Sequence, residues 1–384
     1  MKKFGNRILD IFRKGDMVLL GLAVAASLFG IVMIYAAASY TGSSRYIVVQ
    51  GGTLAAGILI YLAMTAFDVD ILAGQRTLLF IFNTLFIGML LIWGIEGDTG
   101  NKSWLKFPFL PFNIQPAEVC KITFIIILAK TMSIHQNRIS APRSVLTLTA
   151  HMLFIVGLII VISRDTGVAL IFIAIFVAMA YMGGVSGWWL LGGAGAVVVA
   201  SPYLWEYALA DYQKNRILAL IDPEKYDPTG EQYLWQTNLN LEALRNGGLS
   251  GQGLFNGSLT SDGDIPAQHT DSIFATIGEQ LGMIGCLAVL LILLLIVARI
   301  IYVGMKSPDY MNRLICIGIA AMFLFQILIN VGVCLGLLPV VGLALPFFSY
   351  GGSSILTTFM ALGVVSGIKM RPARDISAHY IRPY

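Results

Sequence analysis

The chain has 384 residues, of which 57% are hydrophobic and 12% are charged, and its mean hydropathy is +0.79. Soluble domains carry about 25% charged residues, so this composition excludes a soluble protein and indicates a polytopic membrane protein. The formal net charge of +4 is small, and no stripe of basic residues with interleaved aromatics is present, so we expect no nucleic-acid partner.

The apolar runs predict how often the chain crosses the membrane. A helix needs about twenty mostly apolar residues to span the hydrocarbon core. Ten runs fit this length, and they lie near residues 17–38, 47–66, 77–94, 116–134, 146–163, 167–183, 185–203, 276–299, 314–338 and 353–369. The first run is too long for a signal-peptide core, so we expect a retained helix. The prediction is therefore an all-α protein with about ten transmembrane helices, in a single domain over residues 1–384.

Basic residues predict the orientation of these helices. With ten spans both chain ends lie on one side, which then holds sixteen Lys and Arg residues, while the other side holds eight. The positive-inside rule places the richer side in the cytoplasm. Residues 1–16 and 370–384 are thus expected to be cytoplasmic, and 204–275 forms one large extracytoplasmic loop between helices 7 and 8.

The four cysteines lie within or beside apolar runs, and no Cys-x-x-Cys spacing occurs. Buried reduced thiols are therefore expected instead of disulfides or a zinc site. No cluster of ligands in the sequence predicts a metal site.

The fourth run opens with an ionisable pair. Pro116 suits the first position of a helix, where its missing N–H has no cost, and Glu118 and Lys121 are then i, i+3 neighbours on one face. Lys121 lies about 7.5 Å deeper than Pro116 along the axis. A charged pair at that depth is costly unless it faces a polar cavity, so it is a candidate site. The alternative is that Glu118 complements the helix dipole while Lys121 extends outward to water.

Two further segments interrupt the apolar pattern. Arg164-Asp165-Thr166-Gly167 joins two runs in a very short connection, and these residue types are also those of an ordinary turn. Leu345–Ser354 contains Pro346, Ser349, Tyr350 and the paired glycines Gly351 and Gly352. Irregular backbone at membrane depth survives only against protein or a water-filled cavity, and the following helix N-terminus could receive an anion. A plain outer loop is the alternative for the second segment.

The most polar stretch precedes the eighth run. Eleven of the twenty-one acidic residues lie between Tyr203 and Gly282. Ile265 should be extended because it precedes proline, which places His269 and Asp271 at the start of the eighth span. Asp271 could be a helix cap, and Thr276-x-x-Glu279 matches a capping box. A carboxylate at the membrane edge is, however, partly desolvated, which raises its pKa towards the range of a general base. No dinucleotide, Walker or His-Glu-x-x-His motif appears.

Several ordered motifs resemble one known family over the whole length of the chain. They are Gln115-Pro-Ala-Glu118-x-x-Lys121, Gly247-Gly-Leu-x-Gly-x-Gly253, His269-Thr-Asp271-Ser-Ile-Phe274, Gly278-Glu279-Gln-Leu-Gly282 and Leu345-Pro-Phe-Phe-Ser349-Tyr350-Gly351-Gly352. They look like those of the SEDS (shape, elongation, division and sporulation) proteins RodA, FtsW and SpoVE. The resemblance implies a ten-helix enzyme of the bacterial cell membrane that joins lipid II disaccharides into peptidoglycan strands, together with a class B penicillin-binding protein.

The resemblance also implies roles for single residues. Asp271 matches the essential aspartate of the family, Glu118 and Lys121 its polar cavity pair, and Asp165 the acid of its Pro-Asp-x-Gly turn. Further substrate-binding candidates are Arg216, His269, Glu279, Ser349, Tyr350 and Gly351. This chain departs from the family pattern at Arg164 in place of Pro, at Ser272 in place of Phe, at Gln280 in place of a second Glu, and in an apparent insertion at 106–112. The segment 338–343 and the short tail favour the RodA branch slightly.

The expected chemistry fits these residues. A sugar hydroxyl is a weak nucleophile at neutral pH, so a carboxylate that accepts its proton lowers the barrier. The leaving lipid pyrophosphate needs cations nearby, for which Lys121, Arg216 and Arg245 are candidates, and a divalent Mg or Mn ion could also take part. Two other functions stay open: a lipid II flippase or transporter lined by the Glu118–Lys121 pair, and a non-catalytic cell-wall scaffold.

Overall fold

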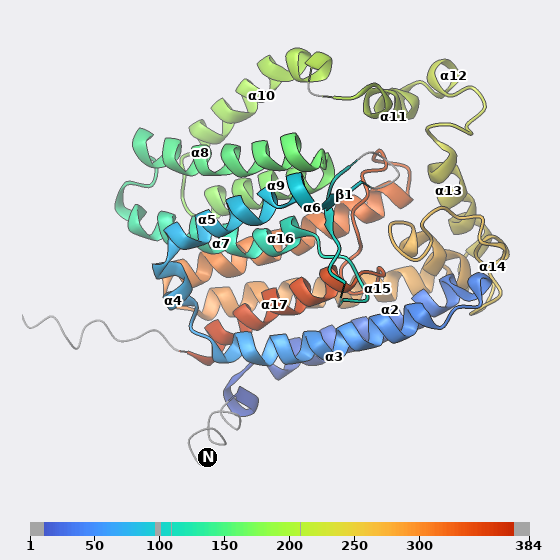
Figure 1. The fold of residues 1–384 in the computed structure, drawn as a ribbon, viewed down its shortest axis with the longest axis horizontal. Helices are drawn as coiled ribbons and strands as arrows, with labels where there is room; N and C mark the ends of the chain where they lie inside the picture. The colour runs from blue at the N-terminus through green and yellow to red at the C-terminus, as the bar shows by residue number, and fades with distance from the viewer. Residues whose placement is uncertain (1–10, 97–100, 109, 208, 372–384) are drawn as a thin grey trace, which may run out of the picture.

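The computed structural model describes residues 11–96, 101–108, 110–207 and 209–371. Long helices run side by side through one bundle (Figure 1). All ten predicted apolar runs coincide with helices. These are α2 (Met17–Ala37), α3 (Arg45–Ala66), α5 with α6 (Arg76–Gly88, Leu90–Trp93), α7 (Pro116–Ile134), α8 with the π-helical turn η3 (Pro142–Leu158, Ile159–Ser163), α9 (Thr166–Met182), α10 (Gly187–Tyr207), α15 (Ile273–Lys306), α16 (Tyr310–Cys334) and α17 (Gly352–Met370).

Eight of these spans are long and apolar enough to cross a membrane, counted over the described part of the chain. Helix α7 carries three charged residues, and α9 is apolar but has only 17 residues. Both nevertheless pack against α16 inside the bundle. The expected all-α polytopic membrane fold is confirmed.

Two predicted boundaries are wrong. The eighth run, expected at 276–299, extends over the longer helix α15. The ninth run, expected at 314–338, is shifted towards the N-terminus because α16 ends at Cys334. Gly336 adopts a left-handed φ of +68°, and the Leu337 N–H donates to the Gly332 carbonyl at 2.8 Å, which is the pattern of a Schellman helix end. The chain therefore leaves the helix early, and residues 335–351 follow an irregular path through the bundle end.

The segment 204–275, expected as a loop, contains helices of its own. They are α11 (Asp211–Ile221), α12 (Pro223–Tyr226), α13 (Trp235–Gly247) and α14 (Ser258–Asp262). Two short 3-10 turns lie outside this segment, η1 (Ser39–Thr41) and η2 (Gln136–Arg138). In Figure 1 α13 and α14 lie at one end of the bundle, opposite the short connecting helix α4 (Val69–Gly74).

The glycine-rich segment 247–253 supplies backbone hydrogen bonds where α15 is interrupted. Gly282 has a φ of +67°, so the helix is interrupted there, and a Cβ at this position would lie 2.4 Å from the Gly251 nitrogen. The backbone of 248–253 replaces the lost helical bonds: Gln252 N–H donates to the Glu279 carbonyl at 2.9 Å, and Met283 N–H donates to the Gly248 carbonyl at 2.9 Å. Two of the sequence motifs thus form one structural joint.

A buried ion pair fixes the opposite end of the bundle. Asp16 is fully buried and accepts from Arg299 Nε at 2.8 Å, with Lys369 Nζ at 3.4 Å. Its backbone N–H donates to Ser366 Oγ at 2.9 Å. The start of α2 and the end of α17 therefore lie at the same end. The expected terminal segments 1–16 and 370–384 fall largely outside the described residues.

The connection between α6 and α7 forms a small hairpin. Strand β1 (Gly94–Ile95) pairs antiparallel with β2 (Trp104–Leu105), and Leu105 bridges to Ile114. This arrangement directs Ser103 and Gln115 towards the start of α9. The described residues of 106–112, the range that departed from the family pattern, are 106–108 and 110–112, and they lie between β2 and the Ile114 bridge.

Candidate active site

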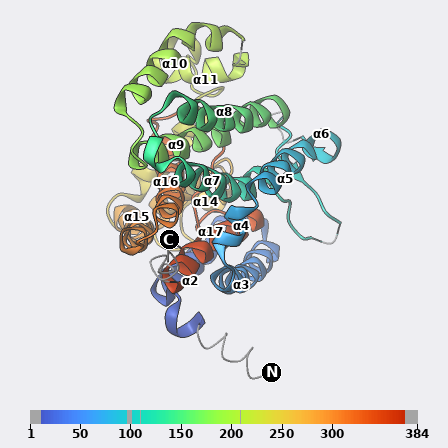
Figure 2. The same cartoon turned by 90° about the vertical axis from the view of Figure 1, so that its left-hand side faces the viewer.

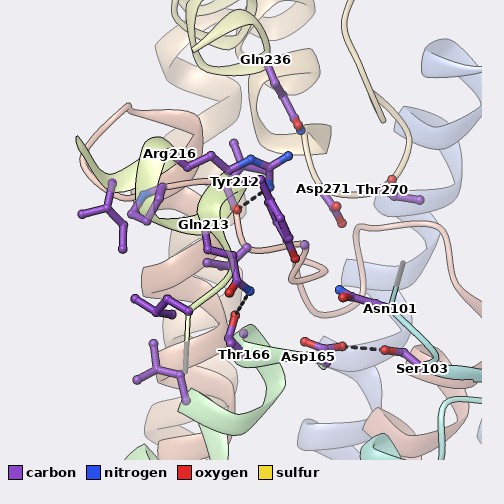
Figure 3. A pocket seen from close by; sticks show the side chains of 18 of the residues that line it. Asn101, Ser103, Asp165, Thr166, Tyr212, Gln213, Arg216, Gln236, Thr270 and Asp271 are labelled. Atoms are coloured by element: carbon purple, nitrogen blue, oxygen red, sulfur yellow. Dashed lines mark hydrogen bonds between the residues drawn. The ribbon is translucent and has the colours of Figure 1, made fainter. Parts of the chain in front are cut away.

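A cavity of about 710 Å³ opens at the bundle end that carries α11 and α13. Six segments contribute to it: the 101–115 connection, the start of α9, helix α11 with Leu209 just before it, the start of α13, the residues just before α15, and the irregular segment after α16 (Figure 3). Its lining residues are Asn101, Ser103, Trp104, Gln115, Asp165, Thr166, Gly167, Leu170, Leu209, Tyr212, Gln213, Arg216, Ile217, Gln236, Thr270, Asp271, Pro339, Val340, Val341 and Gly342. Three predicted site residues, Asp165, Arg216 and Asp271, therefore share one cavity.

Asp271 is half-buried at the wall of this cavity. It does not cap α15: the cap position is Ser272, and no side chain bonds the first turn there. Within the part of the chain that the structure describes, no hydrogen bond or ion pair reaches the Asp271 carboxylate. Burial raises its pKa from 3.8 to about 6, and the charge of Asp165 adds to the rise. The carboxylate is partly shielded from solvent, as expected, and the capping alternative is wrong.

The backbone of Asp271 is held firmly although its carboxylate is free. Asn330 Nδ2 donates to the Asp271 carbonyl at 2.9 Å and to the Leu343 carbonyl at 2.7 Å. Gly342 lies beside the carboxylate, since a Cβ at this position would be 3.7 Å from Asp271 Oδ2. Its φ of +68° favours glycine. One amide on α16 therefore joins the two segments on either side of the carboxylate.

The segment 345–351 supports this arrangement from behind. Ser349 Oγ donates to the Thr270 carbonyl at 2.7 Å, and Tyr350 N–H donates to the His269 carbonyl at 2.8 Å. The Gln50 amide, on α3, donates to the Ser349 carbonyl and accepts from the Gly351 N–H, both at 3.2 Å. The cavity lining does not include Ser349, Tyr350, Gly351 or His269. Their contacts support the backbone segment that carries Asp271.

The ring of His269 belongs to an aromatic cluster. Its centroid lies 4.9 Å from that of Tyr46 and 5.8 Å from that of Tyr350, and both contacts are edge-to-face. Burial lowers the pKa of His269. The contacts with the two tyrosine rings hold the imidazole in place, which is the packing function of aromatic pairs.

Asp165 is the cap of α9 and also faces the cavity. Its Oδ1 accepts from the Val168 N–H at 3.0 Å, while Oδ2 accepts from Ser103 Oγ at 3.1 Å and from Gln115 Nε2 at 3.2 Å. Burial raises the pKa of Asp165, whereas the hydrogen bonds from Val168 and Ser103 oppose the rise. The short turn identified in the sequence is therefore both a helix start and part of the site.

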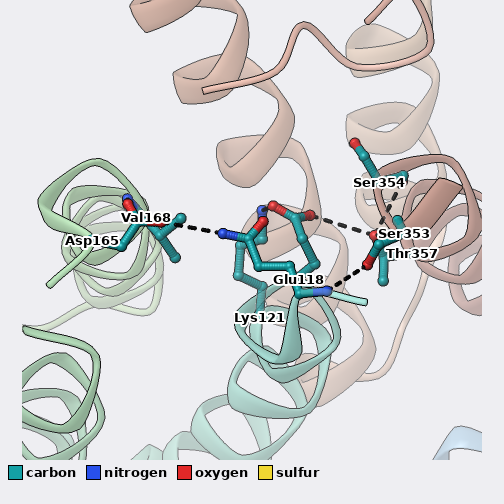
Figure 4. A network of polar contacts seen from close by, with 8 residues as sticks. Glu118, Lys121, Asp165, Val168, Ser353, Ser354 and Thr357 are labelled. Atoms are coloured by element: carbon teal, nitrogen blue, oxygen red, sulfur yellow. Dashed lines mark hydrogen bonds and ion pairs between the residues drawn. The ribbon is translucent and has the colours of Figure 1, made fainter. Parts of the chain in front are cut away.

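Glu118 and Lys121 form an ion pair at 2.7 Å inside the bundle, and Lys121 is only 1% exposed. Neither lines the cavity, and both side chains are buried, so the alternative in which Lys121 reaches outward is wrong. The pair is linked to the cavity through hydrogen bonds (Figure 4). Thr357 Oγ1 donates to Glu118 Oε2 at 3.4 Å and to the Ser353 carbonyl at 2.9 Å.

This chain of contacts continues to Asp165. Ser353 Oγ accepts from the Gln115 N–H at 3.1 Å, and the side chain of the same glutamine reaches Asp165. A polar network thus runs from the buried ion pair on α7, across α17, to the carboxylate at the start of α9. This network holds the Asp165 carboxylate in place through contacts inside the bundle.

Arg216 approaches the cavity from α11. Its Nη1 donates to the Val340 carbonyl at 3.0 Å, and its guanidinium lies 5.7 Å from the centre of the Tyr212 ring. Gln213, one turn earlier, donates to Thr166 Oγ1 at 3.3 Å. These contacts hold α11 over the cavity. Arg245, on α13, is exposed and does not line it.

Glu279 has a different position from the one its motif indicated. It is fully buried, and its carboxylate accepts from the Leu259 and Thr260 N–H groups at 2.8 and 3.0 Å and from the hydroxyl of Thr260. Thr276 Oγ1 donates to the Gln268 carbonyl at 3.0 Å, so no capping box forms. Glu279 caps α14 from the neighbouring helix, at a distance from the cavity lining.

Sequence reasoning missed several residues of the site. Asn101, Tyr212, Gln213 and Gln236 line the cavity, and in Figure 3 Asn101 lies between the two carboxylates. Single polar residues in a connecting segment carry no periodic signal. Gln115 begins one of the motifs that resemble the family. Its position just before Pro116 is the one sequence signal that could have indicated a residue of the site.

The side chains near the cavity offer few ligands for a metal ion. The described residues contain no group of three His, Cys, Asp or Glu side chains that could hold a metal ion. Asp165 and Asp271 do share the cavity, and Mg²⁺ commonly binds one or two carboxylates together with waters and substrate phosphates. Two oxygen ligands for a hydrated divalent ion are therefore present. All four cysteines are buried free thiols, as expected.

Comparisons with known proteins show which family the chain belongs to. The family model for FtsW, RodA and SpoVE, described as cell cycle protein, matches residues 16–373. The chain is 33% identical over 378 residues to the probable peptidoglycan glycosyltransferase FtsW of Geobacter metallireducens, covering 93% of this chain and 95% of that protein. It is 29% identical over 322 residues to the peptidoglycan glycosyltransferase MrdB of Escherichia coli K12, covering 83% and 84% respectively.

Solved structures give the same result. A chain from a peptidoglycan synthase complex, studied for its coordination of polymerization and crosslinking, aligns with a TM-score of 0.78 and 28% identity, covering 92% of this chain and 97% of that one. The rod shape determining protein RodA of Thermus thermophilus aligns with a TM-score of 0.69 and 25% identity, covering 94% and 98%. Relatives named FtsW and RodA both match, so the lean towards RodA stays a prediction. Because the family model covers residues 16–373 and the fold agrees, the chain belongs to the FtsW/RodA/SpoVE family of SEDS proteins.

Proposed function

We propose that this chain is a peptidoglycan glycosyltransferase that polymerises lipid II, with Asp271 as general base. The observation that carries the proposal is the state of the Asp271 carboxylate. It lines a cavity of about 710 Å³, its backbone is fixed, and its oxygens have no partner in the described residues. A group held in place with free acceptor oxygens is suited to take a proton from a bound substrate.

The reaction joins two lipid-linked sugars. A hydroxyl oxygen of the acceptor sugar attacks the anomeric carbon of the donor, the bond from that carbon to the pyrophosphate oxygen breaks, and Asp271 accepts the hydroxyl proton. The pKa of about 6 keeps the carboxylate ionised at neutral pH while making it a stronger base than an ordinary aspartate. The products are a longer glycan strand and a polyprenyl pyrophosphate.

The leaving pyrophosphate gains charge as the bond breaks. Arg216 is the cation at the cavity wall, and one of its nitrogens is already engaged with the Val340 carbonyl, which leaves its other donors for a phosphate. Lys121 is neutralised by Glu118 and lies outside the lining. We therefore assign the charge stabilisation to Arg216 and the fixing of Asp165 to the network behind it. A divalent Mg or Mn ion held by Asp165 would supply further positive charge and leave the Asp271 oxygens free to accept the proton.

Orientation and partner follow from the same proposal. The cavity lies at the end opposite Asp16 and Lys369, which corresponds to the extracytoplasmic side if both termini are cytoplasmic. Lipid II carries its disaccharide at that surface for wall synthesis. A class B penicillin-binding protein is the proposed partner, and support comes from the similarity to a chain in a peptidoglycan synthase complex.

The rival function is a lipid II transporter, and one experiment separates the two. Detergent micelles have no two leaflets, so transport has no meaning in them, whereas glycosyl transfer needs only enzyme and substrate. The purified protein, alone or with its class B penicillin-binding protein, is expected to convert lipid II into a ladder of glycan strands in detergent. If it makes no ladder while reconstituted vesicles move labelled lipid II across the bilayer, the transporter function replaces the polymerase.

A further inference from the structure

The cavity of the candidate active site contains a polar side chain that the proposed reaction does not yet use. Gln236, in the first turn of α13, lines the cavity together with Asp271 and Arg216. Arg216 enters from α11, which Figure 2 shows together with α10 at the outer edge of the bundle, whereas α13 packs against α15. Gln236 therefore reaches the cavity from a different helix than the cation does.

One hydrogen bond fixes the Gln236 side chain beside Asp271. Its Nε2 donates to Ser272 Oγ at 3.1 Å, and Ser272 directly follows Asp271 in the chain. Ser272 is fully buried, and its backbone N–H donates to the Ala267 carbonyl at 3.1 Å. In Figure 3 the amide end of Gln236 points from α13 towards the segment that carries Asp271. The amide thus has a defined position next to the proposed general base.

The same amide keeps hydrogen-bonding capacity that the protein does not use. A glutamine amide has two N–H donors and one carbonyl acceptor, and the bond to Ser272 engages one of the donors. The Gln236 side chain makes no second hydrogen bond to any described residue, and the residue is half-buried at the cavity wall. One donor and the acceptor are therefore available to a molecule in the cavity.

The Gln236–Ser272 bond is not needed to hold α13 in place. The segment 248–253, which follows α13, already joins it to α15 through backbone hydrogen bonds. The end of α13 also packs closely on α15, since a Cβ at Gly247 would not fit against the Gly278 carbonyl. The distinct effect of the bond is to orient an amide in the cavity.

We propose that Gln236 binds the sugar whose hydroxyl is deprotonated by Asp271. The inference rests on the proposed function, in which this sugar belongs to a lipid-linked disaccharide. Sugar hydroxyl and acetamido groups both donate and accept hydrogen bonds, and so do the free N–H and carbonyl of Gln236. Bonds to groups next to the nucleophilic hydroxyl hold that hydroxyl in line with the donor sugar, which is the contribution of positioning to a reaction between two molecules.

The pyrophosphate is not the partner of Gln236. Phosphate oxygens only accept, so they leave the glutamine carbonyl without a donor, and a charged guanidinium such as that of Arg216 binds them more strongly than a neutral amide does. Loss of Gln236 should therefore weaken a lipid that carries the sugars and spare the same lipid without them. This difference separates sugar binding from a general effect on the fold.

The test is native mass spectrometry of the purified full-length protein in detergent, titrated with two lipids. Lipid II carries the sugars, and undecaprenyl pyrophosphate has the same chain and pyrophosphate without them. We expect Gln236→Ala to weaken lipid II binding about tenfold, because the loss of two hydrogen bonds contributes roughly this factor, and to leave undecaprenyl pyrophosphate binding unchanged. Ser272→Ala removes only the anchor, since the Ser272 side chain makes no capping bond to α15. It should weaken lipid II about threefold, because the amide must then be ordered on binding.

Two control variants accompany the titration. Asn246→Ala lies on the same helix, exposed and outside the cavity lining, and should bind both lipids as the unsubstituted protein does. Arg216→Gln should weaken both lipids. Unchanged lipid II binding by Gln236→Ala, or equal losses for the two lipids, would overturn the inference. The mass of the bound lipid identifies it as intact lipid II, so a protein that binds it through Gln236 but forms no strands would refute the polymerase and not this inference.

Discussion

Replacing Lys121 by methionine tests the buried ion pair on α7. In the folded protein Lys121 Nζ lies 2.7 Å from Glu118 Oε1, and the two side chains are 1% and 11% exposed. The substitution keeps the length and apolar stem of the side chain but leaves the Glu118 carboxylate with Thr357 as its one described hydrogen-bond donor. Breaking one half of such a pair typically costs about 3–5 kcal/mol of unfolding free energy.

The double variant Glu118→Gln/Lys121→Met removes both charges. Since neutral groups of similar size have no uncompensated charge to bury, the double variant should be at least about 2 kcal/mol more stable than the sum of the two single losses predicts. Denaturant unfolding of the purified protein in detergent measures each free energy. Lys130→Met, on the same helix and without an ion pair among the described residues, is the control and should change stability little. Additive losses in the cycle would refute the pairing.

Three further predictions concern the carboxylate, its support and the topology. Asp271→Asn should raise the free energy of unfolding at pH 8 and not at pH 4, because a raised native pKa makes ionisation of Asp271 destabilising as pH rises from 3.8 through about 6. The full effect of about 3 kcal/mol is reduced to about 1–2 kcal/mol by the partial exposure of the side chain. An equal or lower stability of the variant at pH 8 would contradict a desolvated carboxylate. Asn330→Ala should lower kcat about tenfold with little change in KM, whereas Gln326→Ala, one turn earlier, should not, and equal effects would remove the positioning role. In intact cells a membrane-impermeant thiol reagent should label Glu224→Cys but not Asn137→Cys, with no background from the buried native thiols, and the reverse pattern would invert the topology.

Local sequence signals predicted the helices well. Pro116 occupies the expected first position of α7, where the missing N–H of proline has no cost. Asp165 was expected only as part of a turn, and it caps α9, which is a common role of aspartate at a helix start. The end of α16 was misplaced because the run of apolar residues continues past it, although Gly336 held the signal for a Schellman end.

Contacts between distant segments were beyond sequence reasoning. The Gln115–Ser353 hydrogen bond joins residues separated by 238 positions, and no periodicity within a single helix indicates such a bond. Glu279 looked like part of a capping box, yet its carboxylate binds backbone groups nineteen and twenty positions earlier. The packing of the bundle determines which polar residues of the sequence motifs face the cavity and which support it.

The most direct test of Asp271 as general base is the polymerisation rate of Asp271→Asn on lipid II in detergent. The amide keeps the size of the side chain but cannot accept the hydroxyl proton, and a general base contributes about 10²–10⁴-fold to a rate. We predict that a folded Asp271→Asn protein, which still binds lipid II, forms glycan strands at least about 10²-fold more slowly than the unsubstituted protein. Strand formation at the unsubstituted rate would contradict the assignment and remove Asp271 from the mechanism.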